Sequence, residues 1–202
     1  MIKLLSFITL GLCRELEAVE KAFEEAMRDI ESVTIGEDNI KSTGIVRDAF
    51  LAQNRFREQP QTFTRTIKRL YKRIKNKQLR REDGKKILTK EGKKAWNEAY
   101  LALQKQPKVS GLLWSPELAK AAKRRCNGRE IDLGAWKGQI GESIAYGKSQ
   151  GAYYMVRLYI DDGIEDRVHR TNMINPEFRQ TGIAHCSHND FEEMIVVLYA
   201  NE

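Results

Sequence analysis

Apolar residues recur at three- and four-residue intervals along the first two thirds of the chain, with polar residues between them. This spacing places the apolar side chains on one face of an amphipathic helix. The pattern is interrupted at Gly36, Pro60 and Pro107, so separate helices are expected rather than one long one. The predicted helices cover residues 14–31, 45–57, 62–77, 89–105 and a segment that starts at Pro116 with Ser115 as its N-cap.

Near the C-terminus the spacing changes from helical to extended. Residues 194–200 form an almost unbroken apolar run, which is typical of a strand that is buried on both faces. Residues 182–186 are expected to form a second strand, with 187–190 as the hairpin loop. Helices followed by such a pair predict an α+β fold in which an antiparallel sheet is covered by helices on both sides.

The net charge of +7 is concentrated in one part of the chain. Residues 55–94 contain sixteen Lys or Arg against four Asp or Glu, so the remainder is mildly acidic. The helix predicted over 62–77 is therefore basic and amphipathic, and it favours an anionic surface as partner rather than nucleic acid. A solvated charged face explains the same residues without any partner. The candidate binding residues are Lys68, Arg69, Lys72 and Arg73.

The termini and cysteines leave the compartment open. Residues 1–12 have the basic start and short apolar run of a secretory signal or anchor, but they lack a small-x-small cleavage site and can equally begin the first helix. Cys126 and Cys186 can pair in an oxidising compartment or remain free thiols. We expect an N-terminal helical extension over 1–43, a domain over 44–202, and an extracellular or lumenal location, with a cytoplasmic location as the alternative.

Blocks of residues in the predicted domain occur in an order and spacing that resemble the bacterial and protist branch of the CAP superfamily. This superfamily is named for cysteine-rich secretory proteins, antigen 5 and pathogenesis-related proteins. The resemblance spans about residues 44–202 and implies a three-layer α-β-α sandwich with a central cleft. The blocks are 54–60 (NRFREQP), 113–119 (LWSPELA), 141–147 (GESIAYG), 161–163 (DDG), 169–178 (HRTNMINPEF) and 182–184 (GIA).

The resemblance also implies a set of cleft residues, which is incomplete in this chain. Family members often hold two histidines and two acids that bind a divalent metal. Glu142 matches the Gly-Glu-Asn motif, with Ser143 in place of Asn, and His169 matches the later histidine, but the other histidine has no counterpart. Asp161 can stand near the second acidic position, and Arg170 follows His169 as a binding candidate.

Glu142 and His169 are therefore expected to face each other across the cleft as an acid and base pair. With so few ligands, His169 is expected to support at most weak divalent metal binding, and no other cofactor is expected. The main hypothesis is a monomeric, non-catalytic CAP module that binds a small lipid-like or surface ligand. The alternatives are a hydrolase that uses Glu142 and His169, and a binder of anionic polymers or membranes through the basic residues of 65–77.

Overall fold

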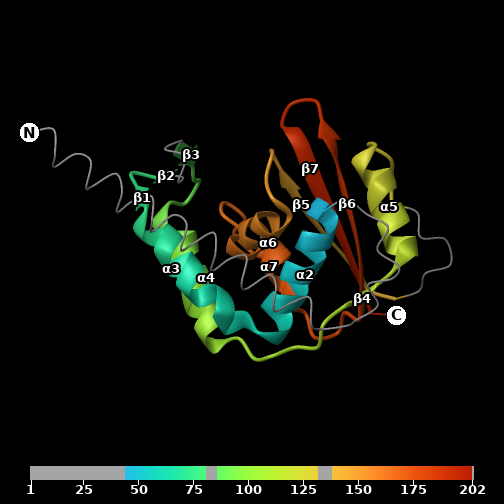
Figure 1. Cartoon of the computed structure of the whole chain (residues 1–202), viewed down its shortest axis with the longest axis horizontal. Coiled ribbons are helices and arrows are strands. Elements are labelled where there is room, and N and C mark those ends of the chain that lie inside the picture. Colours follow the sequence, from blue (N-terminus) through green and yellow to red (C-terminus); the bar gives the residue numbers. More distant parts are fainter. Residues whose placement is uncertain (1–43, 81–85, 132–137, 202) are drawn as a thin grey trace, which may run out of the picture. The chain divides into compact units, whose positions relative to one another are not determined.

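The computed structural model describes residues 44–80, 86–131 and 138–201 (Figure 1). These residues all belong to the second of the two units, 1–37 and 38–202, into which the chain divides. The helix predicted over 14–31 and the signal-like residues 1–12 lie outside the described residues. The boundary predicted between residues 43 and 44 stays a prediction.

A four-stranded sheet lies at the centre of the domain, in the order β4-β6-β7-β5. Strand β7 pairs antiparallel with both β5 and β6, and the short β4 runs parallel to β6. Both predicted strands are confirmed, although β6 continues to His188, so the hairpin loop is 189–191 rather than 187–190. The strands are β4 (Leu113–Trp114), β5 (Ile140–Tyr146), β6 (Gln180–His188) and β7 (Glu192–Ala200).

Helices cover both faces of this sheet, which confirms the α-β-α sandwich (Figure 1). On one face, Leu118 and Ala122 of α5 (Pro116–Cys126) pack against Val196 and Leu198 of β7. As predicted, the Ser115 side chain caps α5 by accepting a hydrogen bond from the Leu118 N–H at 3.2 Å. The other face is covered by α2 (Gly44–Glu58), α6 (Gly151–Ile160) and α7 (Val168–Ile174).

One buried arginine joins the parts of this second helical layer. Arg57 of α2 is 0% exposed, and burial lowers its pKa to about 10, so it stays charged at neutral pH. Its guanidinium donates hydrogen bonds to four backbone carbonyl groups, those of Ser110, Met173, Asn175 and Phe178. These bonds hold α2 against the segment before β4 and against the end of α7.

The basic segment after α2 differs from the prediction of a single helix over 62–77. A short 3₁₀ turn, η2 (Pro60–Phe63), leads into α3 (Thr64–Lys72), which ends five residues before Lys77. The prediction was wrong because Asn76 and Lys77 have φ of 51° and 58° and form the two-residue turn of a β-hairpin. The helical spacing of apolar residues therefore extends past the end of α3, to Ile74 in a small sheet. The strands of this sheet are β1 (Ile74–Lys75), β2 (Gln78–Arg80) and β3 (Lys86–Leu88).

Helix α4 (Lys93–Lys105) begins later than the predicted residue 89. Thr89 is held by the small sheet, since its N–H and hydroxyl both donate to the Lys77 carbonyl at 2.7 Å. Gly92 then adopts a left-handed φ of 64°, which no residue inside an α-helix has. Trp96 and Leu103 of this helix are buried, and the helix packs against α3.

A disulfide joins Cys126, at the end of α5, to Cys186 of β6, with the two Cα atoms 6.0 Å apart. The sequence left open whether these thiols pair. The bond closes a loop whose ends are 60 residues apart in sequence, and such loops lose much conformational entropy when the unfolded chain is cross-linked.

We expect reduction of this disulfide to lower the free energy of unfolding by about 2–4 kcal/mol. The measurement is urea unfolding with and without reductant, and the control is the double variant Cys126→Ser, Cys186→Ser, which should resemble the reduced protein and ignore reductant. Identical unfolding midpoints for the oxidised and reduced wild-type protein would contradict this expectation.

Candidate functional site

Glu142 lies in β5, at one edge of the central sheet. Side chains alternate along a strand, so Glu142 and Ile144 point to the face covered by α5, and Ser143 points to the other face. The Glu142 carboxylate pairs with Arg125 of α5, with 3.0 Å between Oε2 and Nε. Sequence analysis missed Arg125, because nothing in the pattern of α5 marks this arginine among its neighbouring cations.

His169 lies in the first turn of α7, next to Asp161. The backbone N–H groups of His169 and Arg170 donate to Oδ2 of Asp161 at 2.8 Å and 3.3 Å. Asp161 is 2% exposed, and burial raises its pKa, although the nearby His169 and these hydrogen bonds act in the opposite direction. Asp161 thus fixes the start of the helix that carries His169.

The structure places Glu142 and His169 in different surroundings. Helix α7 packs on the face of β5 opposite α5. The approach is close at Gly141, where an added Cβ would lie only 2.9 Å from Oδ1 of Asn172. Asn172 donates a hydrogen bond to the Glu142 backbone carbonyl at 2.9 Å, which ties α7 to the sheet edge. Within the described ranges, no hydrogen bond or ion pair joins the Glu142 and His169 side chains. Their role as an acid and base pair stays a prediction.

Arg170 belongs to a network of ion pairs between α4 and the approach to α7. Its guanidinium contacts Glu98 at 2.9 Å and also donates to the carbonyl groups of Tyr159 and Ile160. Arg167, which is 8% exposed, contacts Glu98 at 2.9 Å and Glu91 at 2.6 Å. The donors of Arg170 are therefore engaged with protein groups, which does not support its role in binding an external ligand.

The Asp-Asp-Gly block serves the same junction. The Asp162 carboxylate accepts hydrogen bonds from the N–H groups of Lys90 and Glu91 at 2.7 Å and 2.8 Å. Gly163, with φ of 88°, donates its N–H to Oε1 of Glu91 at 2.7 Å. The block thus positions backbone: Asp161 holds the start of α7 and Asp162 holds the segment before α4.

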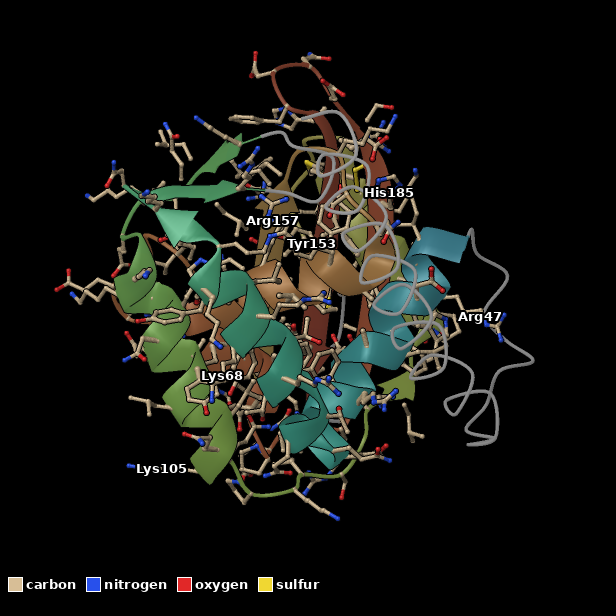
Figure 2. All side chains as sticks on the ribbon, turned by 60° about the vertical axis from the view of Figure 1, so that its left-hand side comes forward. Arg47, Lys68, Lys105, Tyr153, Arg157 and His185 are labelled. Carbon is tan, nitrogen blue, oxygen red and sulfur yellow. A yellow bond between two sulfur atoms is a disulfide. The ribbon has the colours of Figure 1, made fainter. Side chains whose placement is uncertain are left out.

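Three of the four basic candidates lie on α3, which packs beside α4, and the fourth, Arg73, is the C-cap residue of this helix. Lys68 and Lys72 are exposed, and Arg69 and Arg73 are half-buried. The Lys68 ammonium lies 5.6 Å from the ring centre of Tyr100 on α4, and Figure 2 shows Lys68 and Lys105 on these neighbouring helices. The surface therefore combines cations with tyrosine rings.

The site does not fit the divalent metal that the resemblance implies. In the part of the chain that the structure describes, no group of three or more His, Cys, Asp and Glu side chains could hold a metal ion. The Glu142 carboxylate already pairs with a guanidinium, and His185 contacts Glu193 at 3.1 Å. His188 lies among aromatic rings at the tip of the β6–β7 hairpin. Weak metal binding at His169 stays a prediction.

A surface hollow lies beside the segment that follows α4. Residues 106–110, Ile174, Pro176 and Arg179 line it, so neither Glu142 nor His169 contributes. Among the described residues, no helix is both long and apolar enough to cross a membrane.

Similarity to known proteins covers most of the chain. The family model described as CAP, the cysteine-rich secretory protein family, matches residues 51–199. A solved structure titled "Structure of BmVAL-1" is 16% identical in sequence, with a TM-score of 0.40, and the similarity covers 84% of this chain and 82% of that chain. No curated protein matches. The branch within the superfamily stays a prediction.

We expect Arg167→Met to lower the free energy of unfolding by about 3 kcal/mol, near the lower end for a broken buried ion pair because Glu98 is partly exposed. Within the described residues, Glu91 would then keep only the exposed Lys94 as a cationic partner, and Glu98 would keep only Arg170. The matched control is Lys94→Met, since Lys94 also contacts Glu91 but is 80% exposed and should matter little. Chemical denaturation measures both variants, and equal losses would contradict the structural role of Arg167.

The same network predicts an acid limit to stability. The hydrogen bond from Arg167 lowers the pKa of Glu91 to about 2, whereas an unfolded glutamate titrates near pH ~4.3. The folded pKa is the lower one, so this stabilisation is complete above the unfolded pKa and is lost as the pH falls through the window between them. Denaturation of wild type and Glu91→Gln across this window should show their difference shrink with acid. A difference that does not depend on pH would contradict this assignment.

Proposed function

We propose that this chain, which belongs to the cysteine-rich secretory protein (CAP) family, is a non-catalytic binding module that attaches to anionic lipid surfaces. The observation that carries the proposal is the concentration of cations on α3, α4 and the small sheet. Residues 64–80 and 86–94 contain twelve Lys or Arg and one acid, Glu91. Because Glu91 pairs with the nearly buried Arg167, it does little to neutralise the lysines around it.

Lipid surfaces fit this region better than a soluble polyanion does, because apolar and aromatic groups lie among the cations. Leu88 of β3 is 77% exposed and stands near Lys86 and Lys90 in sequence. Leu101 of α4 is 46% exposed and precedes Lys105 by one helical turn. Leucine side chains can enter the headgroup region while lysines keep their charge in water.

The size of the electrostatic effect is sufficient for reversible attachment. Each Lys or Arg near an anionic leaflet contributes about 1 kcal/mol, and salt weakens this contribution. A few of the exposed lysines, such as Lys68, Lys72 and Lys93, would together give measurable binding at low salt. The lipid-like ligand of the sequence hypothesis then corresponds to the headgroups of the surface itself.

The proposal includes a secreted or lumenal location. The disulfide between Cys126 and Cys186 supports it, because such bonds persist in oxidising compartments. A hydrolase that uses Glu142 and His169 is the less supported alternative, since the Glu142 side chain pairs with Arg125 and the His169 backbone N–H donates to Asp161.

Vesicle sedimentation tests the proposal directly. The probe is phosphatidylcholine vesicles with and without phosphatidylserine, at low and high salt. The double variant Lys68→Glu, Lys72→Glu should lose at least about 2 kcal/mol of binding free energy, roughly thirtyfold in affinity. The matched control is Lys120→Glu, Lys123→Glu on α5, which changes the net charge equally on exposed lysines outside the basic region.

Wild type and control should bind the anionic vesicles, and salt should release both. Equal losses in the two double variants would contradict a specific basic surface. Binding to heparin or DNA without binding to vesicles would replace the lipid surface by another class of anion.

A further inference from the structure

Three aromatic rings form a cluster at the end of the central sheet where β6 turns into β7 (Figure 1). Tyr146 is the last residue of β5, His188 is the last residue of β6, and Phe191 lies in the hairpin loop. The three ring centres are 5.1 Å, 5.1 Å and 5.2 Å apart. Phe191 is 51% exposed and Tyr146 is 40% exposed, so the cluster is open to the surface. Grouped apolar side chains on a surface commonly mark a binding site.

Glu192 places a carboxylate beside two of these rings. It follows Phe191 in sequence, and it lies directly opposite His188 in the antiparallel pair of β6 and β7, where facing residues are neighbours. Glu192 is exposed, whereas the next acid, Glu193, is partly buried and pairs with His185 at 3.1 Å. The cluster therefore combines three rings with one surface carboxylate.

Hydrogen bonds hold this end of the sheet in one conformation. The Asp190 N–H donates to Nδ1 of His188 at 3.2 Å, and an imidazole that accepts in this way is neutral. The Glu193 N–H donates to the Phe191 carbonyl at 2.7 Å, so Glu192, with φ of 65°, is the centre of a three-residue turn. A left-handed φ is strained for a residue other than glycine, and such strain is concentrated at functional sites. Because the turn is already ordered, a ligand would bind it at a low entropic cost.

A cation is the ligand that this combination favours. The face of an aromatic ring attracts a cation that lies within about 6 Å of the ring centre. With the three centres 5.1–5.2 Å apart, a cation about 4 Å above their plane would be within this limit for all three rings. Glu192 adds the opposite charge. The charged residues next to the cluster in sequence, Lys148 and Asp190, are both exposed and opposite in sign, so their effects largely cancel.

From this arrangement we propose that the cluster binds a quaternary ammonium group, such as that of choline. The binding residues are Tyr146, His188, Phe191 and Glu192. Ring faces offer apolar contact and few acceptors, which suits an ammonium whose hydrogens are replaced by methyl groups. A primary ammonium would lose hydrogen bonds to water there and regain few of them. The site shares no residue with the basic region and binds the opposite charge, so it does not rest on the proposed attachment to anionic surfaces.

Titration of the full chain with choline and with ethanolamine, followed by amide NMR spectroscopy, tests the proposal. The two probes have the same charge and the same hydroxyethyl group, and they differ in their methyl groups. Choline should shift the signals of residues 146–148 and 188–193 with a dissociation constant on the order of millimolar, and ethanolamine should bind at least about threefold more weakly. Equal binding of the two probes, or no shift at these residues with choline, would overturn the proposal.

Substitutions of Phe191 test the contribution of the rings. Phe191→Leu keeps an apolar side chain without a ring and should weaken choline binding about two- to fivefold, the effect of one exposed cation–π contact. Phe191→Trp supplies a ring with a stronger attraction for cations and should bind choline at least as tightly as wild type. Equal affinities of wild type and Phe191→Leu would overturn the proposal, because apolar contact alone would then explain the binding.

The contribution of the carboxylate is tested by Glu192→Gln. Its matched control is Glu177→Gln, which removes the same charge from another exposed residue. Choline binding should weaken in Glu192→Gln and stay unchanged in Glu177→Gln. Equal losses in the two variants would attribute the attraction to the overall charge of the chain and would overturn the proposal.

Vesicle sedimentation identifies whether the ammonium group belongs to a lipid. The probes are phosphatidylcholine vesicles and vesicles in which phosphatidylethanolamine replaces part of the phosphatidylcholine, at high salt to screen the basic region. A preference for pure phosphatidylcholine that Phe191→Leu loses would assign the site to a lipid headgroup. Binding of free choline without this preference would assign it to a soluble amine, and both results support a site for quaternary ammonium groups.

Discussion

The guanidinium of Arg57 is the interaction on which the second helical layer depends. It is buried and charged, and within the described residues its hydrogen bonds go to backbone carbonyl groups and not to a carboxylate, so its stability in the interior comes from the carbonyl dipoles around it. These carbonyl groups belong to the segment before β4 and to the residues after Arg170 that close α7. One side chain therefore fixes three pieces of backbone that are distant in sequence. Replacing it would leave both a cavity and several unpaired carbonyl groups.

Elements with a long and clear pattern could be predicted from the sequence. Very short strands, a helix that is buried all round and a strand of mixed composition could not. Helix α5 and strand β7 were recognised because burial alternates or persists over their length. Helix α6 is buried almost all round, so it shows no amphipathic stripe, and β5 mixes glycine, glutamate and serine with its apolar residues. The strands β1, β2 and β3 have two or three residues each, too few for any period to appear. Their left-handed turn at Asn76 and Lys77 was also hidden inside an apparently helical pattern.

The family motifs indicated Glu142 as a site residue, but the sequence could not supply its ion-pair partner. The pair Arg125 and Glu142 spans 17 residues, and the pair Glu91 and Arg167 spans 76. Contacts over such distances are set by how the layers pack, which residue spacing along one element does not reveal. Arg125 neutralises Glu142, which its motif indicates as an acid of a reactive site. Arg167 neutralises Glu91, to which the sequence analysis assigned no role. The ion pair with Arg125 thus gives Glu142 a structural role within the fold, whereas its motif indicates a reactive one.

The link between Cys126 and Cys186 has a consequence for the order in which the domain opens. Helix α5 is the single described helix on its face of the sheet, and its main contacts are with β6 and β7. The covalent link holds its C-terminal end to β6, while the cap at Ser115 and the parallel pairing of β4 hold the other end. Separation of α5 from the sheet is therefore tied to separation of β6, and complete release of the helix should coincide with global unfolding.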